Sequence, residues 1–149
     1  MVDDGDIFLC PNFVLSDGCV HNTLFLIISG GTPFTPLLCI KATTKLERYR
    51  PLEEGCNNSD KHFYKSFFIP SDWDECFKDD TCLDLRQLYV IPFNDFIHYR
   101  EKNGLKQLGK MSSYCFDSVL ECLSTQIDDI AEDLMERIID ARTKIVFDF

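Results

Sequence analysis

Short apolar runs separated by turn-forming residues dominate the first hundred positions. β-branched and aromatic side chains gather in the runs 6–10, 23–29, 37–43, 63–69 and 81–89, and such runs are typical of strands. Asp17-Gly18 and Gly30-Gly31 stand between them, and these residue types favour turns. The polar segment 49–60 reads as a loop, and residues 73–78 as one helical turn or part of an insertion. Strands at this spacing predict a small β-barrel over about residues 5–111 rather than a βαβ fold.

The C-terminal part follows a helical period instead. Ser112 and Ser113 suit a helix N-cap, because a hydroxyl accepts the first unpaired backbone N–H groups. After them, apolar residues recur at steps of three and four, at 116, 119, 120, 123, 127, 130, 134 and 138, which places them on one helix face. The opposite face is acidic, with Asp117, Glu121, Asp128, Asp129, Glu132, Asp133, Glu136 and Asp140.

Residues 113–141 contain neither glycine nor proline. They therefore predict one long acidic amphipathic helix, straight or kinked, and residues 143–148 predict an added strand. A small barrel cannot cover a helix of this length, so we expect part of the helix to bury against a partner. Together the two patterns predict a mainly β protein with some α-helix, folded as a single domain over residues 1–149.

Composition sets the class of protein. The chain has 45% hydrophobic and 27% charged residues, which is ordinary for a globular domain with a real core. Its N-terminus lacks the basic and apolar stretches of a secretory signal. The longest apolar run, residues 24–28, is far too short to span a membrane. We therefore expect a cytoplasmic protein without membrane association.

The eight cysteines do not form a metal-binding pattern. They stand at 10, 19, 39, 56, 76, 82, 115 and 122, and none shows C-x-x-C spacing. This spacing predicts no structural zinc site. In a reducing cytosol we expect free thiols that act as small core residues. No phosphate-binding glycine motif is present either, so no cofactor and no metal are expected.

Charge is distributed unevenly along the chain. The net charge is -10, which argues against tight non-specific binding to nucleic acid. Two basic stretches nevertheless interrupt the acidity: Lys41, Lys45, Arg48 and Arg50, and further on His98, Arg100, Lys102, Lys106 and Lys110. Each is either a solvated surface or a specific RNA site, and composition does not decide between them.

Several short segments occur in an order known from one family. Gly5-Asp6-Ile7 opens the first run, residues 23–29 and 37–44 form the next two, and Leu108-Gly109-Lys110-Met111-Ser112 precedes the predicted helix. This order resembles the PemK/MazF toxins over about residues 5–125. The resemblance implies an SH3-like barrel and a homodimer. It also implies metal-independent cleavage of single-stranded RNA, and a protein antitoxin or another protein as partner.

The family's catalytic pair is an Arg at the start of the second strand and a Thr or Ser after the third. By position, the hydroxyl role falls on Thr43 or Thr44. The Arg position falls within residues 21–23, where His21 stands and no arginine is present. Attack by the RNA 2′-OH needs a base, an acid and positive charge at the phosphorane.

In this interpretation His21 is a candidate acid or base, and its alternative is an exposed turn residue. The charge and the RNA contacts are expected from a basic group made of Lys41, Lys45, Arg48 and Arg50.

Two functions stay open from the sequence. The first is an endoribonuclease toxin of a toxin–antitoxin or defence system, favoured by the basic stretches and the retained threonines. The second is a catalytically inactive toxin-fold module or inhibitor that acts through protein–protein interaction. The overall acidity, the missing arginine and the long C-terminal helix favour this second function.

Overall fold

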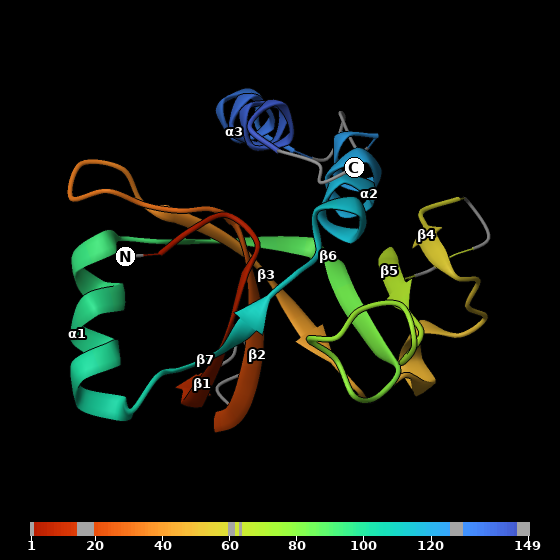
Figure 1. The fold of residues 1–149 in the computed structure, drawn as a ribbon, viewed down its shortest axis with the longest axis horizontal. Coiled ribbons are helices and arrows are strands. Elements are labelled where there is room, and N and C mark those ends of the chain that lie inside the picture. The colour runs from red at the N-terminus through yellow and green to blue at the C-terminus, as the bar shows by residue number, and fades with distance from the viewer. Residues whose placement is uncertain (1, 15–19, 60–61, 63, 126–129, 146–149) are drawn as a thin grey trace.

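The computed structural model describes residues 2–14, 20–59, 62, 64–125 and 130–145 (Figure 1). These residues form a sheet with helices on both of its faces. In chain order the elements are β1 (Asp6–Val14), β2 (Val20–Ser29), β3 (Leu37–Thr43), the 3-10 helix η1 (Glu47–Tyr49), β4 (Gly55–Asn57), β5 (Ser66–Ile69), β6 (Thr81–Ile91), α1 (Phe93–Asn103), β7 (Lys106–Lys110), α2 (Ser113–Ser124) and α3 (Glu132–Thr143).

The strands form one antiparallel sheet in the order β4-β5-β6-β3-β2-β1-β7. The mainly β class is thus confirmed, and the strands predicted at 23–29, 37–43 and 81–89 lie within β2, β3 and β6. Among the described residues the sheet is open, with β4 and β7 at its edges. A closed barrel over residues 5–111 is therefore not confirmed.

Some strand boundaries differ from the prediction. β1 continues through Pro11-Asn12 to Val14, because a register shift between Cys10 and Phe13 accommodates a proline that cannot donate to the ladder. The predicted loop 49–60 contains β4, which pairs with β5. Residues 71–79 form turns and bends instead of the helical turn expected at 73–78.

The prediction of one helix over 113–141 is wrong, because two helices occupy this part of the chain. Ser112 caps α2 as expected, since its side chain accepts a hydrogen bond from Cys115 N. The first helix ends at Ser124, and the hydroxyl of its C-cap, Thr125, donates a hydrogen bond to the carbonyl of Cys122. α3 begins at Glu132. Both helices contribute to the same apolar cluster, so they pack on the same side of the sheet. Folding the helix back buries its apolar stripe within the chain.

The predicted tail strand 143–148 is not observed in the described part of the chain. Thr143 is the last residue of α3, Lys144 caps that helix, and residues 146–148 lie outside the described residues. α1 was not predicted as a helix at all. Its sequence, FNDFIHYREKN, has weak amphipathic character, so the helical signal is faint.

The helices cover opposite faces of the sheet (Figure 1), and one apolar cluster lies on each face. One lies between the sheet and the pair α2 and α3, and includes Leu26, Ile40, Leu83, Val119 and Ile138. The other lies beneath α1 and includes Phe8, Phe25, Cys39 and Phe96. Because successive strand residues point to opposite faces, each central strand contributes to both clusters. No described helix is long and apolar enough to cross a membrane.

The prediction that all cysteines are free is wrong for one pair. Cys56 of β4 and Cys122 of α2 form a disulfide, with their Cα atoms 5.6 Å apart, a separation that suits the bond. The described cysteines 10, 39, 76, 82 and 115 are free thiols. The bridge depends on α2 lying over β4, a tertiary arrangement that spacing along the chain does not reveal.

Candidate functional site

Polar side chains gather at one end of the sheet face that carries α1. At the other end, the face is apolar: Phe8 contacts Phe96 of α1 edge to face, with ring centroids 5.3 Å apart. The register then places Phe25 opposite Lys41, and Lys41 opposite Asp84. Directly opposite residues share a face of the sheet. Lys41 and Asp84 therefore continue the row of Phe8 and Phe25 toward β5, where the face becomes polar.

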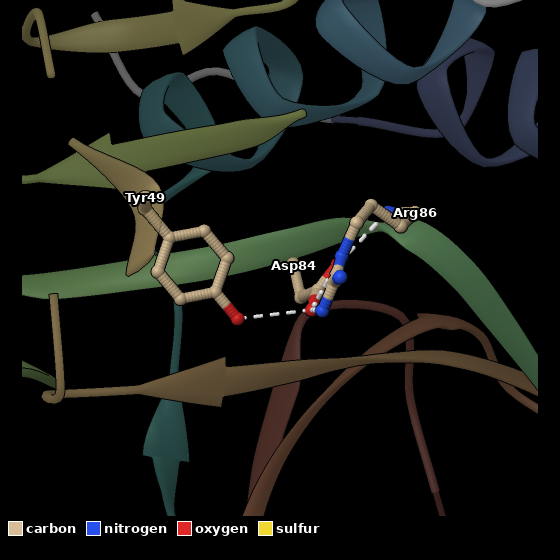
Figure 2. A network of polar contacts seen from close by, with 3 residues as sticks. All are labelled: Tyr49, Asp84 and Arg86. Carbon is tan, nitrogen blue, oxygen red and sulfur yellow. Dashed lines mark hydrogen bonds and ion pairs between the residues drawn. The ribbon is translucent and has the colours of Figure 1, made fainter. Parts of the chain in front are cut away.

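Asp84 is the centre of this polar end (Figure 2). The Tyr49 hydroxyl donates to its Oδ2 over 2.9 Å. From the other side, Arg86 Nη2 donates to Oδ2 at 2.7 Å and Nε donates to Oδ1 at 3.0 Å. The Arg86 backbone N–H also donates to Oδ1, at 2.9 Å. One buried carboxylate, 6% exposed, thus holds a tyrosine of η1 and an arginine of its own strand.

These contacts set the protonation states of the cluster. Burial acts to raise the pKa of Asp84, but the hydrogen bonds and charge of Arg86, with the Tyr49 hydroxyl, outweigh it and lower that pKa. Burial and the adjacent Asp84 charge raise the pKa of Tyr49. The hydrogen bond to Asp84 raises the pKa of Arg86. Asp84 is thus ionised and Tyr49 neutral near pH 7, so the cluster positions charge rather than transferring protons.

Two tyrosine rings flank the Arg86 guanidinium. Its Cζ lies 4.1 Å from the Tyr64 ring centroid and 6.0 Å from that of Tyr49, and the two rings meet edge to face at 5.8 Å. Such stacking orients a guanidinium and leaves its edge available for an anion. The Arg86 side chain remains 39% exposed, so the cation faces solvent while its plane is held.

An irregularity in β6 gives Arg86 this position. Lys41 pairs with Asp84 and Cys39 pairs with Tyr89, so two steps along β3 face five steps along β6. Residues 85–88 of β6 thus lie opposite Ile40 alone and form a bulge, and bulges redirect side chains next to functional sites. Arg86 and Gln87 are exposed there, while Leu85 stays buried in the core.

Most of the basic residues predicted as RNA contacts lie around this cluster. Lys41 is half-buried on β3, beside Asp84. Arg48 and Arg50 are exposed and flank Tyr49 in the chain. Because Tyr49 is buried and bonded to Asp84, it fixes the segment that carries both arginines. Lys45, which is also exposed, follows β3 directly.

The structure describes the side chains of two of the three predicted catalytic residues. Thr43 ends β3 opposite Cys82, and its Oγ1 accepts a hydrogen bond from Lys45 N at 3.1 Å. A hydroxyl that accepts keeps its own proton for donation. Thr44 follows and is exposed. His21 lies in β2, where its backbone pairs with Phe13, but its side chain lies outside the described residues, so its catalytic role stays a prediction.

The sequence interpretation missed four residues of the site: Tyr49, Tyr64, Asp84 and Arg86. One signal was available. Asp84 is an acidic residue between Leu83 and Leu85 in an apolar run, and a buried acid requires a partner. Arg86, two positions later, lies on the same side of a strand. The contribution of Tyr49 and Tyr64 could not be seen, because it depends on how residues 44–65 fold over the sheet.

Within the described part of the chain, no three His, Cys, Asp or Glu residues gather as a possible metal site. No family model matches the chain, and no curated protein matches it at a significant level of similarity. The function of this chain is therefore inferred from the cluster itself and from the resemblance of the short motifs.

Proposed function

We propose that this chain is a PemK/MazF-like protein that binds single-stranded RNA at the polar end of the sheet, around Asp84. The observation that supports the proposal is the Tyr49–Asp84–Arg86 network, which orients the Arg86 guanidinium on the strand that pairs with Lys41 and Thr43. Phosphate recognition needs positive charge, and stacked arginine and tyrosine planes suit exposed bases. The contacts to Asp84 use Nε and Nη2 of Arg86, so its Nη1 can reach a phosphate oxygen.

The first form of the proposal is a metal-independent endoribonuclease. The family's arginine is missing at residues 21–23, and Arg86 with Lys41 supplies the positive charge that the phosphorane requires. Thr43 or Thr44 provides the hydroxyl donor and His21 the acid or base. In this form the chain belongs to a toxin–antitoxin or defence system, and acts as a cytoplasmic homodimer that a protein antitoxin inhibits. The SH3-like barrel of the family is a prediction within this proposal.

The second form is a binding module or inhibitor without catalysis. It is favoured by the chemistry of the cluster, because the carboxylate of Asp84 is already paired with Arg86 and Tyr49 keeps its proton. Neither group therefore serves as a general acid or base near neutral pH. In both forms the Cys56–Cys122 bridge counts against a cytoplasmic location, because cytosolic thiols are normally kept reduced.

RNA binding is tested by titrating a fluorescein-labelled, single-stranded RNA of mixed sequence with the purified chain at low salt. We expect Arg86→Ala to weaken binding about tenfold, since one charged hydrogen bond is worth on the order of 1.5–3 kcal/mol. The matched control is Lys78→Ala, an exposed cation in the segment that contacts the start of α2 through Asp74 and Ser112. Equal affinity of wild type and Arg86→Ala would contradict the proposed site.

Cleavage is tested on the same RNA in EDTA. The nuclease form predicts cleavage by the wild type, and its loss in Thr43→Ala and His21→Ala while both variants still bind RNA. RNA binding without cleavage by the wild type decides for the binding module. A protein that neither binds nor cleaves RNA contradicts both forms.

A further inference from the structure

The two C-terminal helices form a groove on their outer side, away from the sheet. Arg142, near the end of α3, donates through Nε to Asp117 Oδ1 near the start of α2, at 2.8 Å. The end of α3 therefore lies beside the start of α2. The groove between them has a volume of about 460 Å³. Leu120 and Ile138 are buried at its bottom, and Ile139 on its wall is 50% exposed.

Asp117 lines this α2–α3 groove, and further acidic residues lie along both helices. Along α2, Asp117 and Glu121 are one turn apart, and along α3, Glu132 and Glu136 precede Ile139 by seven and three positions. Residues three, four or seven apart share a helix face. Both helices together carry six acids and two arginines, a net charge of -4.

The two arginines offset this charge more on α2 than on α3. Arg137 turns toward the sheet, where its Nη2 donates to Ser29 Oγ at 2.9 Å. Arg142 bridges Asp117 and lies 3.7 Å from Glu121. Glu132, Glu136 and Asp140 are exposed, so α3 keeps an excess of acidic side chains beside the groove. An exposed isoleucine next to exposed glutamates suits an occupant that is both apolar and basic.

We propose that the α2–α3 groove binds a basic amphipathic helix of a partner protein. The apolar stripe of such a helix covers Ile139 and lies above Leu120, and its lysines or arginines meet Glu121, Glu132 and Glu136. This is the helix-in-groove mode of recognition. A second copy of this chain is a poor occupant, because its own helices are acidic, and RNA is repelled for the same reason. The inference is independent of RNA binding, which uses the opposite face of the sheet.

The probe is a synthetic helical peptide with leucines on one face and lysines on the other, added to the full chain. Two control peptides are used: one with the same residues in an order that mixes the faces, and one with glutamate for lysine. We expect only the amphipathic basic peptide to bind with saturation and to shift the backbone amide NMR signals of α2 and α3. Ile139→Lys should weaken this binding about tenfold or more, as loss of a central anchor does.

Charge is tested separately with the double variant Glu132→Lys and Glu136→Lys. The double variant should bind the basic peptide more weakly and the glutamate peptide more tightly than the wild type does. Glu101→Lys, an equally exposed acid on α1, is the matched control and should change neither. Circular dichroism verifies that every variant keeps its fold.

Three results would overturn the proposal: equal binding of the mixed-face peptide, signals that shift away from α2 and α3, or unchanged affinity in Ile139→Lys. Analytical ultracentrifugation measures the oligomeric state and so tests whether a second copy of the chain occupies the groove. A wild-type dimer that Ile139→Lys converts to a monomer would assign the groove to self-association instead.

Discussion

Tyr49 and Asp84 are 35 positions apart in the chain, and their side-chain oxygens lie 2.9 Å apart. This bond connects η1 to β6 and so holds the segment that carries Arg48 and Arg50 against the sheet. The same Asp84 oxygen accepts from Arg86. A single carboxylate therefore determines where three of the cations around the proposed RNA site stand.

Replacing Asp84 by asparagine should destabilise the fold. The substitution removes the charge that Arg86 and Tyr49 share, inside a site that is 6% exposed. Loss of a buried charged partner costs about 3–5 kcal/mol, but Arg86 is 39% exposed, and solvent screening reduces the expected loss to about 2 kcal/mol. Urea unfolding measures it. Asp79→Asn, at an exposed site, is the control and should stay within about 0.5 kcal/mol of wild type.

The lowered pKa of Asp84 makes part of the stability depend on pH. A carboxyl whose folded pKa lies below its unfolded value, near 3.8, stabilises the fold at any pH above that value. This contribution is lost as the pH falls through the folded pKa, because the unfolded chain takes up the proton first. The stability difference between wild type and Asp84→Asn should thus be largest at neutral pH and shrink below about pH 4. A constant difference from pH 7 to pH 3 would contradict this assignment.

Reduction of the Cys56–Cys122 disulfide should lower stability without abolishing the sheet. The bridge spans 66 positions, and a loop of that length is expected to contribute about 2–4 kcal/mol, mostly by restricting the unfolded chain. Dithiothreitol should shift the urea midpoint of the wild type downward. The variant with Cys56→Ser and Cys122→Ser should start at the lower midpoint and show no further shift on reduction.

A side chain at Gly30 should disturb the N-terminal segment. A Cβ there would lie 2.3 Å from the backbone oxygen of Val2, and the Gly30 N–H donates to Asp4 at 2.7 Å. Because backbone atoms must move, Gly30→Ala should cost about 2–3 kcal/mol. Gly104→Ala is the comparison: nothing lies within 4 Å, but its φ of +71° leaves a strain cost of about 1 kcal/mol. Equal losses in thermal unfolding would contradict the contact with Val2.

Local patterns predicted the local parts of this fold. The runs 23–29 and 37–43 become strands, and Phe116, Val119, Leu120 and Leu123 are all buried as the helical spacing indicates. The same spacing could not show that the helix folds back, because apolar steps of three and four continue unchanged through residues 124–131. α1, the open sheet and the disulfide depend on tertiary packing, which periodicity does not record.

The candidate site likewise contains some residues that the sequence predicted and others that it did not. Lys41 was predicted from a basic stretch and Thr43, with Thr44, from the family resemblance. Lys41 and Thr43 lie on strand β3, paired with Asp84 and Cys82 of β6. Arg86 was missed because its position depends on a bulge opposite Cys39 and Lys41. A bulge arises from the pairing of two strands, so the sequence of either strand alone does not predict it.

The bridge between Cys56 and Cys122 also turns the middle of the chain into a covalent ring. Asp84, Arg86, β5, α1 and β7 all lie inside it. A protease that cuts once within residues 57–121 therefore leaves two fragments that travel together on a gel until a reductant separates them. Limited digestion can thus nick the segment 70–80 without releasing either half, and RNA titrations of the nicked species would report how far the proposed site depends on an intact backbone.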